Sequence, residues 1–470
     1  MLLKEEDDAN FLFFAVPTAG DFLQMVQFLF DDKVAFLWNA TELFDNILVF
    51  ITFFDITQYF GDIITWNLFL LLFYGYVAII FIIIVDIIYV SISFNRKQFT
   101  SLWPLIFLRN FVNMAVTFLF LPISESLLSM IDCQFNVEAQ QYVHTVYPDI
   151  ICYVGTHLIH TIFSVGFTAV FVIISLIVAI NYFETRMSSP NILARSNSRA
   201  EVCFIMNKIV LQLVFMVVGN TWILVLTSFF GALTLAYYYL YDDAYYNRMV
   251  AQFYKILSLL YLWSCSILVV LKILEGVDYS GGAVVWASAI PFIVIFSWGF
   301  SRNSLKTLTK NQIKFESARE LIDHTRFVLQ LMEYHKKDKQ SYLVLVGYMQ
   351  KHKIVCPQPD CPLKVTTPKI RNLENEEKKE WETKLLQVID RMYESGINKF
   401  RLSVRLRIMY AFFLLEKMNN KKKALEELTI AENLKPSFED EFLIYRYKKI
   451  IDENLDEQNS GENEGEVDIV

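Results

Sequence analysis

The stretch of sequence that decides the fold is residues 67–92, NLFLLLFYGYVAIIFIIIVDIIYVSI, in which Asp86 is the single charged residue. An α-helix rises 1.5 Å per residue, so this stretch would be about 39 Å long, against about 30 Å for the hydrocarbon core of a bilayer. A helix of a soluble protein normally keeps one polar face, and this stretch has none. It therefore predicts a membrane-spanning helix.

Further apolar runs of membrane-spanning length follow before residue 302, near 103–122, 157–182, 206–240, 252–273 and 283–301. The chain is 54% hydrophobic, and its charged residues are dense only after this point. The run 206–240 is about twice as long as one crossing requires, and Gly219-Asn220-Thr221 near its middle favours a hairpin of two helices. We therefore predict a polytopic membrane domain over residues 63–301, with about six to eight spans.

The first 62 residues are apolar but are interrupted by acidic side chains, at Asp21, Asp31, Asp32, Glu42, Asp45 and Asp55. This pattern is typical of amphipathic helices that lie in the membrane interface or pack against other helices. One weak crossing near residues 43–60 is also compatible with it. The six apolar runs give seven spans when the run 206–240 is counted as two helices, and a crossing near residues 43–60 would give eight.

The sides of the membrane are predicted from arginine and lysine in the short loops, which favour the cytoplasm. The loops 93–102 and 184–204 are basic, and the long segment after residue 301 is rich in lysine. The loop 123–156 contains acidic residues but neither lysine nor arginine, which places it outside. We expect an integral membrane protein with a cytoplasmic C-terminus, in a membrane that the sequence does not identify.

Residues 302–455 change to an amphipathic helical pattern, so the whole chain is predicted to be all-α, and the acidic residues 456–470 are expected to be disordered. Within this domain, Ala424, Leu428, Ala431 and Pro436 match the spacing of the second helix of a tetratricopeptide repeat. In that repeat, small residues allow two helices to pack closely, and proline ends the unit. An ordinary amphipathic hairpin is the alternative.

Candidate metal ligands lie before and within a proline-rich interval of the same domain. His352, Cys356 and Cys361 fall within ten residues and could occupy three corners of a zinc site, with His335 as the fourth ligand. The alternative is a pair of free cytosolic thiols. Apart from this structural zinc, we expect no cofactor.

Two further pairs are predicted in the membrane domain. Cys133 and Cys152 flank the loop placed outside the cytosol, where a disulfide would be stable. Asp86 and Arg109 lie equally far from the basic loop between their spans, so they would sit at the same depth in an antiparallel hairpin. We expect them to form an ion pair, because an isolated charge in the bilayer is costly. Separate polar partners are the alternative.

Three blocks of sequence carry a resemblance to a known family. They are Phe120-Leu121-Pro122-Ile123-Ser124-Glu125 with Cys133, Cys152-x2-Gly155-x-His157-x2-His160, and the run from His352 through Phe400-Arg401-Leu402-Ser403-Val404 to Pro436. The chain resembles, over about residues 20–455, the protist multi-span proteins similar to tiny macrocysts proteins B and C, which carry a cytoplasmic domain of tetratricopeptide-like repeats. Longer members continue into PAS-type sensor domains, which we expect to be absent from this sequence. The resemblance implies no established biochemical activity.

Motifs typical of enzymes are missing from the sequence, including Gly-rich phosphate loops, Gly-x-Ser-x-Gly and His-Glu-x2-His. We therefore expect a protein that is not an enzyme. The leading hypothesis is a membrane signalling or scaffold protein whose cytoplasmic repeats bind a partner protein, since helical repeats form concave binding surfaces. A channel or transporter subunit is the alternative. The expected partners are the lipid bilayer and an unidentified cytoplasmic protein, and nucleic acid is not among them.

Overall fold

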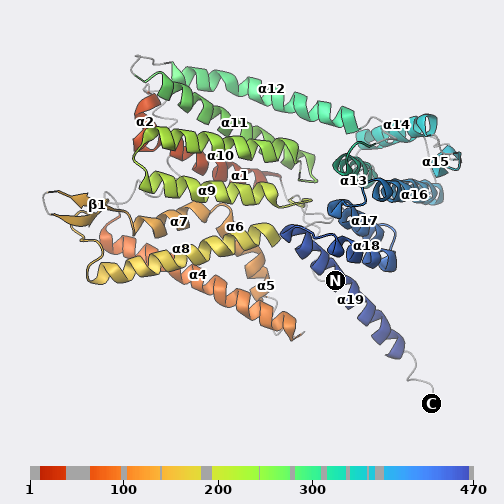
Figure 1. Cartoon of the computed structure of the whole chain (residues 1–470), viewed down its shortest axis with the longest axis horizontal. Coiled ribbons are helices and arrows are strands. Elements are labelled where there is room, and N and C mark those ends of the chain that lie inside the picture. The colour runs from red at the N-terminus through yellow and green to blue at the C-terminus, as the bar shows by residue number, and fades with distance from the viewer. Residues whose placement is uncertain are drawn as a thin grey trace. The chain divides into compact units, whose positions relative to one another are not determined.

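The computed structural model of the chain describes residues 11–38, 64–96, 103–137, 140–181, 193–242, 244–275, 281–308, 315–334, 339–356, 359–365 and 375–464. The chain forms two compact units (Figure 1). Unit 1 lies within residues 1–183 and 190–298, and unit 2 consists mainly of the chain from Gly299 onward. Apart from one short hairpin of strands in unit 1, the described part of the chain is all-α.

Among the described residues of unit 1, six helices are long and apolar enough to cross a membrane. They are α4 (Trp66–Asn95), α8 (Thr156–Asn181), α9 (Arg199–Val217), α10 (Thr221–Tyr241), α11 (Arg248–Ile273) and α12 (Gly282–Leu308). The hairpin expected near Gly219 is confirmed, because α9 ends before it and α10 begins after it. Asn220 caps α10 by accepting a hydrogen bond from the Trp222 amide at 2.9 Å.

The span expected over residues 103–122 is not one helix, which corrects the sequence prediction. The chain here forms α5 (Trp103–Phe107), the π-helical turn η4 (Leu108–Val112), α6 (Asn113–Val116) and α7 (Phe120–Ser129). Proline at position 122 provides no amide proton to continue a helix across the break. Two carbonyls at the break accept side-chain donors instead, Thr117 from Lys208 at 3.3 Å and Phe118 from Gln24 at 3.1 Å. Broken helices persist inside a membrane domain when their backbone groups are satisfied in this way.

The N-terminal segment runs through the interior of unit 1. It comprises α1 (Phe11–Gln27), η1 (Phe28–Phe30), α2 (Asp32–Ala35) and η2 (Phe36–Trp38). Phe14 lies against Tyr254 near the start of α11, with ring centroids 5.8 Å apart, and the Phe36 ring lies 5.9 Å from the ammonium of Lys272 at the end of α11. Residues 11–38 therefore follow the full length of α11 and pack against it. The possible crossing at 43–60 lies outside the described residues.

Unit 1 has two ends, which we name after residues that lie there. The Arg195 end carries Arg195 and Tyr245, and the disulfide end carries the Cys133–Cys152 disulfide. The chain passes lengthwise between the ends in the six long helices, in the broken segment 103–129 and in the segment 11–38. At the disulfide end, β1 (Cys133–Asn136) pairs antiparallel with β2 (Gln141–His144).

Unit 2 is built from helices that are joined mostly by short connections. They are α13 (Ala318–Tyr334), α14 (Lys339–Val355), α15 (Pro362–Val365), α16 (Asn375–Lys399), α17 (Val404–Glu416), α18 (Lys421–Asn433) and α19 (Phe438–Glu464). α18 packs against both α17 and α19, and α17 also contacts α19. Helix α19 continues to Glu464, which differs from the disorder expected beyond residue 455. Once a helix is anchored by packing, as at Leu443 and Tyr447, each added residue contributes one more hydrogen bond.

Candidate functional site

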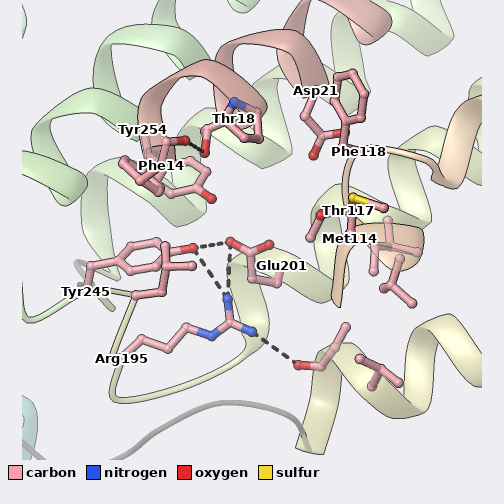
Figure 2. A pocket seen from close by; sticks show the side chains of 16 residues that line it. Phe14, Thr18, Asp21, Met114, Thr117, Phe118, Arg195, Glu201, Tyr245 and Tyr254 are labelled. Atoms are coloured by element: carbon pink, nitrogen blue, oxygen red, sulfur yellow. Dashed lines mark hydrogen bonds and ion pairs between the residues drawn. The ribbon is translucent and has the colours of Figure 1, made fainter. Parts of the chain in front are cut away.

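A cavity of about 240 Å³ lies toward the Arg195 end of unit 1 (Figure 2). It is lined by residues from α1, α6, α8, α9, α11, the break between α6 and α7, and the loops that carry Arg195 and Tyr245. Two carboxylates, Asp21 and Glu201, and one guanidinium, Arg195, are among its lining residues. A cavity with this many ionisable groups is unusual between membrane-spanning helices, where such groups are rare and often functional.

Glu201 is the centre of a hydrogen-bonded cluster on one wall of the cavity (Figure 2). Its Oε1 atom lies 3.3 Å from Nη1 of Arg195 and accepts hydrogen bonds from the hydroxyls of Tyr239, at 3.2 Å, and Tyr245. The ring of Tyr254 stacks between the rings of these two tyrosines, with both centroid separations at 4.8 Å. The cluster holds the glutamate charge in place from several elements at once.

Asp21 and Lys208 form a second ion pair beside the same cavity. The Lys208 side chain is fully buried, the Asp21 side chain is 11% exposed, and Nζ of Lys208 donates to Oδ1 of Asp21. The Phe204 ring lies 4.6 Å from the same ammonium. With the Arg195–Glu201 pair, the site contains two positive and two negative groups, so its formal charge is zero.

Sequence reasoning did not identify this site. Asp21 was noted only as an interruption of an apolar segment, and Arg195 only as part of a basic loop. The available signal was Lys208, which is the sole charged residue of the apolar run 206–240. An ionisable residue inside a span requires a partner. That partner lies 187 residues away in the sequence, so spacing could not reveal it.

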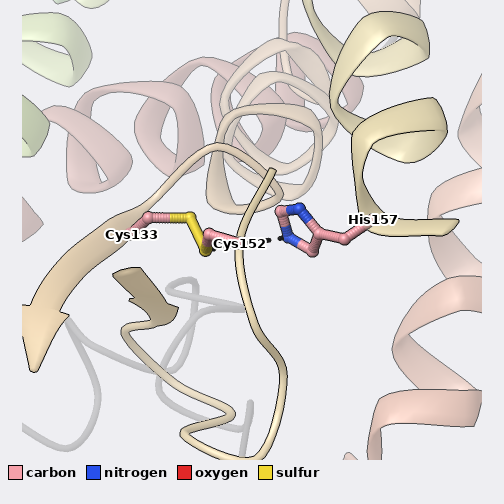
Figure 3. A group of neighbouring side chains, drawn as sticks. All are labelled: Cys133, Cys152 and His157. Atoms are coloured by element: carbon pink, nitrogen blue, oxygen red, sulfur yellow. Dashed lines mark hydrogen bonds between the residues drawn. A yellow bond between two sulfur atoms is a disulfide. The ribbon is translucent and has the colours of Figure 1, made fainter. Parts of the chain in front are cut away.

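Cys133 and Cys152, the predicted disulfide pair, are bonded to each other in the structure (Figure 3). The bond joins the start of β1 to the segment that precedes α8. Nε2 of His157 lies 4.0 Å from Sγ of Cys152. The three ligand-type atoms are close enough together for a metal. Because both sulfurs are bonded to each other, however, they are not available as thiolate ligands.

Histidine and aromatic rings fill the space beneath this disulfide. Trp66 stacks on His157, and His144 lies edge-on to Trp66. His144 is completely buried, and its Nδ1 accepts hydrogen bonds from the amides of Val146 and Tyr147, both at 3.2 Å. Burial, with the neighbouring charge of His157, lowers the pKa of His144 to about 4. The folded protein therefore keeps this imidazole neutral.

We expect acid to destabilise the disulfide end through His144. In the unfolded chain the His144 imidazole has its ordinary pKa of about 6.5, whereas in the folded chain its pKa is about 4. Between these two pH values the unfolded chain binds a proton that the folded chain does not bind, so the free energy of unfolding decreases as pH falls through this window. The loss is at most about 3 kcal/mol. His144→Asn keeps an acceptor for the two amides but cannot titrate. Thermal unfolding of the purified protein should therefore depend less on pH in this variant than in the wild type, and equal pH dependence would contradict the assignment.

The predicted Asp86–Arg109 ion pair stays a prediction. Asp86 lies on α4 and Arg109 in η4, and these two elements pack against each other. The side chain of Arg109 lies outside the described residues. Oδ2 of Asp86 is buried and has no hydrogen-bond partner among the described side chains. A cation at the position of Arg109 would supply the missing partner.

A charge exchange tests this pair. Asp86→Arg and Arg109→Asp should each lower the yield of folded protein, because each variant places two like charges in the apolar region, where one unpaired charge costs about 2.5–3.5 kcal/mol. The double exchange should restore most of the yield, measured by size-exclusion chromatography in detergent. A double variant no better than the worse single variant would show that each charge has another partner.

Three of the four predicted metal ligands come together in unit 2. The ligand atoms of His352, Cys356 and Cys361 lie within 4.8 Å of one another. Burial, and then the charge of Lys364, lower the pKa of His352, which favours the neutral imidazole. The fourth predicted ligand, His335, lies outside the described residues.

The residues predicted for repeat packing lie on one side of α18. Ala424, Leu428 and Ala431 are completely buried, whereas Thr429 and Ile430 between them are exposed. Pro436 follows the end of the helix and is half-buried. The two small residues, Ala424 and Ala431, thus lie on the buried side of α18.

The fold and this arrangement define an all-α integral membrane protein with a separate helical unit after its last span. The chain is similar to Tiny macrocysts protein B of Dictyostelium discoideum, at 21% identity over 437 residues that cover 87% of this chain and 30% of that protein. It is also similar to Tiny macrocysts protein C of the same organism, at 25% identity over 179 residues covering 38% of this chain and 13% of that protein. The chain thus spans less than a third of the length of these relatives. No family model and no solved structure matches it.

Proposed function

We propose that this protein is a membrane signalling or scaffold protein whose unit 2 lies in the cytoplasm and binds a partner protein. It is not proposed to catalyse a reaction. The observation that carries the proposal is a pair of exposed aromatic side chains on α19 in unit 2. Phe438 and Tyr445, seven residues apart and thus on one face, are 70% and 63% exposed. Exposed aromatic side chains of this kind are enriched at the centres of protein interfaces.

The distribution of cysteines supports the cytoplasmic placement of unit 2. The disulfide lies at one end of unit 1, and α12 ends at the other, where Gln252 of α11 donates to Ser297 at 2.9 Å. The cysteines of unit 2, Cys356 and Cys361, are free thiols. Disulfides persist in oxidising compartments, and free thiols are typical of the cytosol.

The proposal is tested by purification of the full-length protein from its native cells, followed by quantitative mass spectrometry of the proteins that accompany it. A specific partner should be retained by the wild type and lost from Phe438→Ala/Tyr445→Ala. Ile354→Ala removes a side chain of α14 that is 83% exposed, and serves as the matched control. Absence of any protein that distinguishes the double variant from this control would contradict the proposal.

A channel or transporter subunit is the second candidate, and the charged cavity of unit 1 favours it. Transport sites lie within membrane domains at broken helices, and the cavity is lined by the break between α6 and α7. Ion currents or solute flux in reconstituted vesicles that vanish in Glu201→Gln would support this function over the first. Retained flux in that variant would argue against the cavity as the transport site.

A further inference from the structure

The α14–α15 turn of unit 2 brings two thiols and an imidazole together from three separate positions. Cys356 follows His352 by one helical turn, and its amide donates to the His352 carbonyl at 2.9 Å. Both side chains therefore project from the same face at the end of α14. Cys361 immediately precedes α15, and its carbonyl accepts a hydrogen bond from the Lys364 amide at 2.9 Å. The turn therefore brings Sγ of Cys361 close to the ligand atoms of His352 and Cys356.

The spacing of these atoms matches the edge of a zinc tetrahedron. Bond lengths of about 2.3 Å to sulfur and about 2.05 Å to nitrogen, at the tetrahedral angle, place the two ligand atoms about 3.6 Å apart. Sγ of Cys361 lies 3.6 Å from Nε2 of His352. The third ligand atom is within 4.8 Å of both. The three atoms are thus arranged for a metal before any rearrangement of the backbone.

The site is also enclosed and held in place. His352 is 7% exposed and Cys361 is 1% exposed. Nη1 of Arg391, on α16, donates to the carbonyl of Asp360 at 3.0 Å, which fixes the turn to a neighbouring helix. Thiolate and imidazole ligands in such a site suit zinc, and calcium and magnesium prefer oxygen ligands.

We propose that His352, Cys356 and Cys361 bind one zinc ion, with solvent as the fourth ligand, and that this ion fastens the α14–α15 turn. Among the residues that the structure describes, no fourth histidine, cysteine or carboxylate groups with these three, so the fourth position is assigned to solvent. The length of α14 argues against His335. His352 comes thirteen residues after Lys339, the first residue of the helix, and these two residues are about 20 Å apart along the axis. His335 precedes that first residue, so the proposal assigns it no role in binding.

The test measures zinc by inductively coupled plasma mass spectrometry in the full-length protein, purified in detergent without chelators and then supplied with zinc and desalted. The wild type should retain about one zinc per chain, and Cys356→Ser and Cys361→Ser should retain less than about a tenth of that amount. Cys203→Ser, which changes a free cysteine of unit 1, and His335→Ala should both retain the wild-type amount. Loss of zinc from His335→Ala would overturn the assignment of the fourth position.

A second measurement uses only the wild-type protein, so it does not depend on the folding of any variant. Cys356 and Cys361 should react with a maleimide slowly in the zinc-loaded protein and at least about tenfold faster after removal of zinc by a chelator, because a metal-bound thiolate is shielded from the reagent. Reaction rates that are unchanged by the chelator would overturn the proposal. So would a disulfide between these two residues in protein purified under reducing conditions.

Discussion

Lys208→Met should destabilise unit 1 by about 3–5 kcal/mol, because it leaves the Asp21 carboxylate buried without its cation. Methionine is close to lysine in length, so the variant removes charge more than volume. The same substitution also removes the donor to the Thr117 carbonyl at the helix break. Thermal unfolding of the purified protein, followed by tryptophan fluorescence, should show a large decrease in the midpoint.

The double variant Asp21→Leu/Lys208→Met distinguishes two causes of instability, the unpaired charge of Asp21 and the loss of the packing contacts of Lys208. Replacing both members of a buried ion pair by apolar residues is often close to neutral, so the double variant should recover most of the stability. Lys272→Met is the matched control, because Glu275, the partner of Lys272, is 44% exposed and can be solvated by water. A single variant no less stable than this control would show that the Asp21–Lys208 pair contributes little.

Ala431→Glu should disrupt the helices α17, α18 and α19 of unit 2. Ala431 is completely buried on the face of α18 that also carries Ala424 and Leu428. A glutamate there adds volume to a close-packed contact and buries a charge without a partner, at a cost of about 3 kcal/mol or more. Limited proteolysis with mass spectrometry should detect new cleavage sites between residues 404 and 452.

Thr429→Glu is the control for this variant, since it places the same charge on an exposed position of the same helix. It should leave the cleavage pattern unchanged. If Ala431→Glu were also unchanged, the small residues would not be required for packing, and the assignment of a repeat-like contact would be wrong.

The sequence predicted those parts of the fold that depend on local pattern. Five of the predicted apolar runs correspond to the six long helices, because the polar Gly219-Asn220-Thr221 divides the run 206–240 into α9 and α10. The amphipathic pattern of residues 302–455 identified the helical character of unit 2. Each of these features arises from residues that are close together in the chain, so single-sequence reasoning can detect them.

The parts that sequence reasoning missed depend on distant contacts. Residues 103–122 have the composition of a span, but their broken backbone is stabilised by donors from Gln24 and Lys208. The segment 11–38 contains Asp21, which argues against a buried position unless Lys208 is known to lie beside it. The candidate cavity was missed for the same reason, because its charged groups come from α1, α9 and a loop and become a site only when the fold brings them together.

The path of residues 11–38 through unit 1 has a consequence for biosynthesis. This segment emerges from the ribosome before α9, because the cation that neutralises Asp21 lies 187 residues later in the chain. At about 5–20 residues per second, the ribosome needs on the order of ten seconds or more to reach it. Until α9 has been inserted, the segment lacks a partner for its carboxylate inside the bilayer. We therefore expect it to wait at the membrane surface or beside the translocon, and the final step of assembly to be its entry among helices that are already in place.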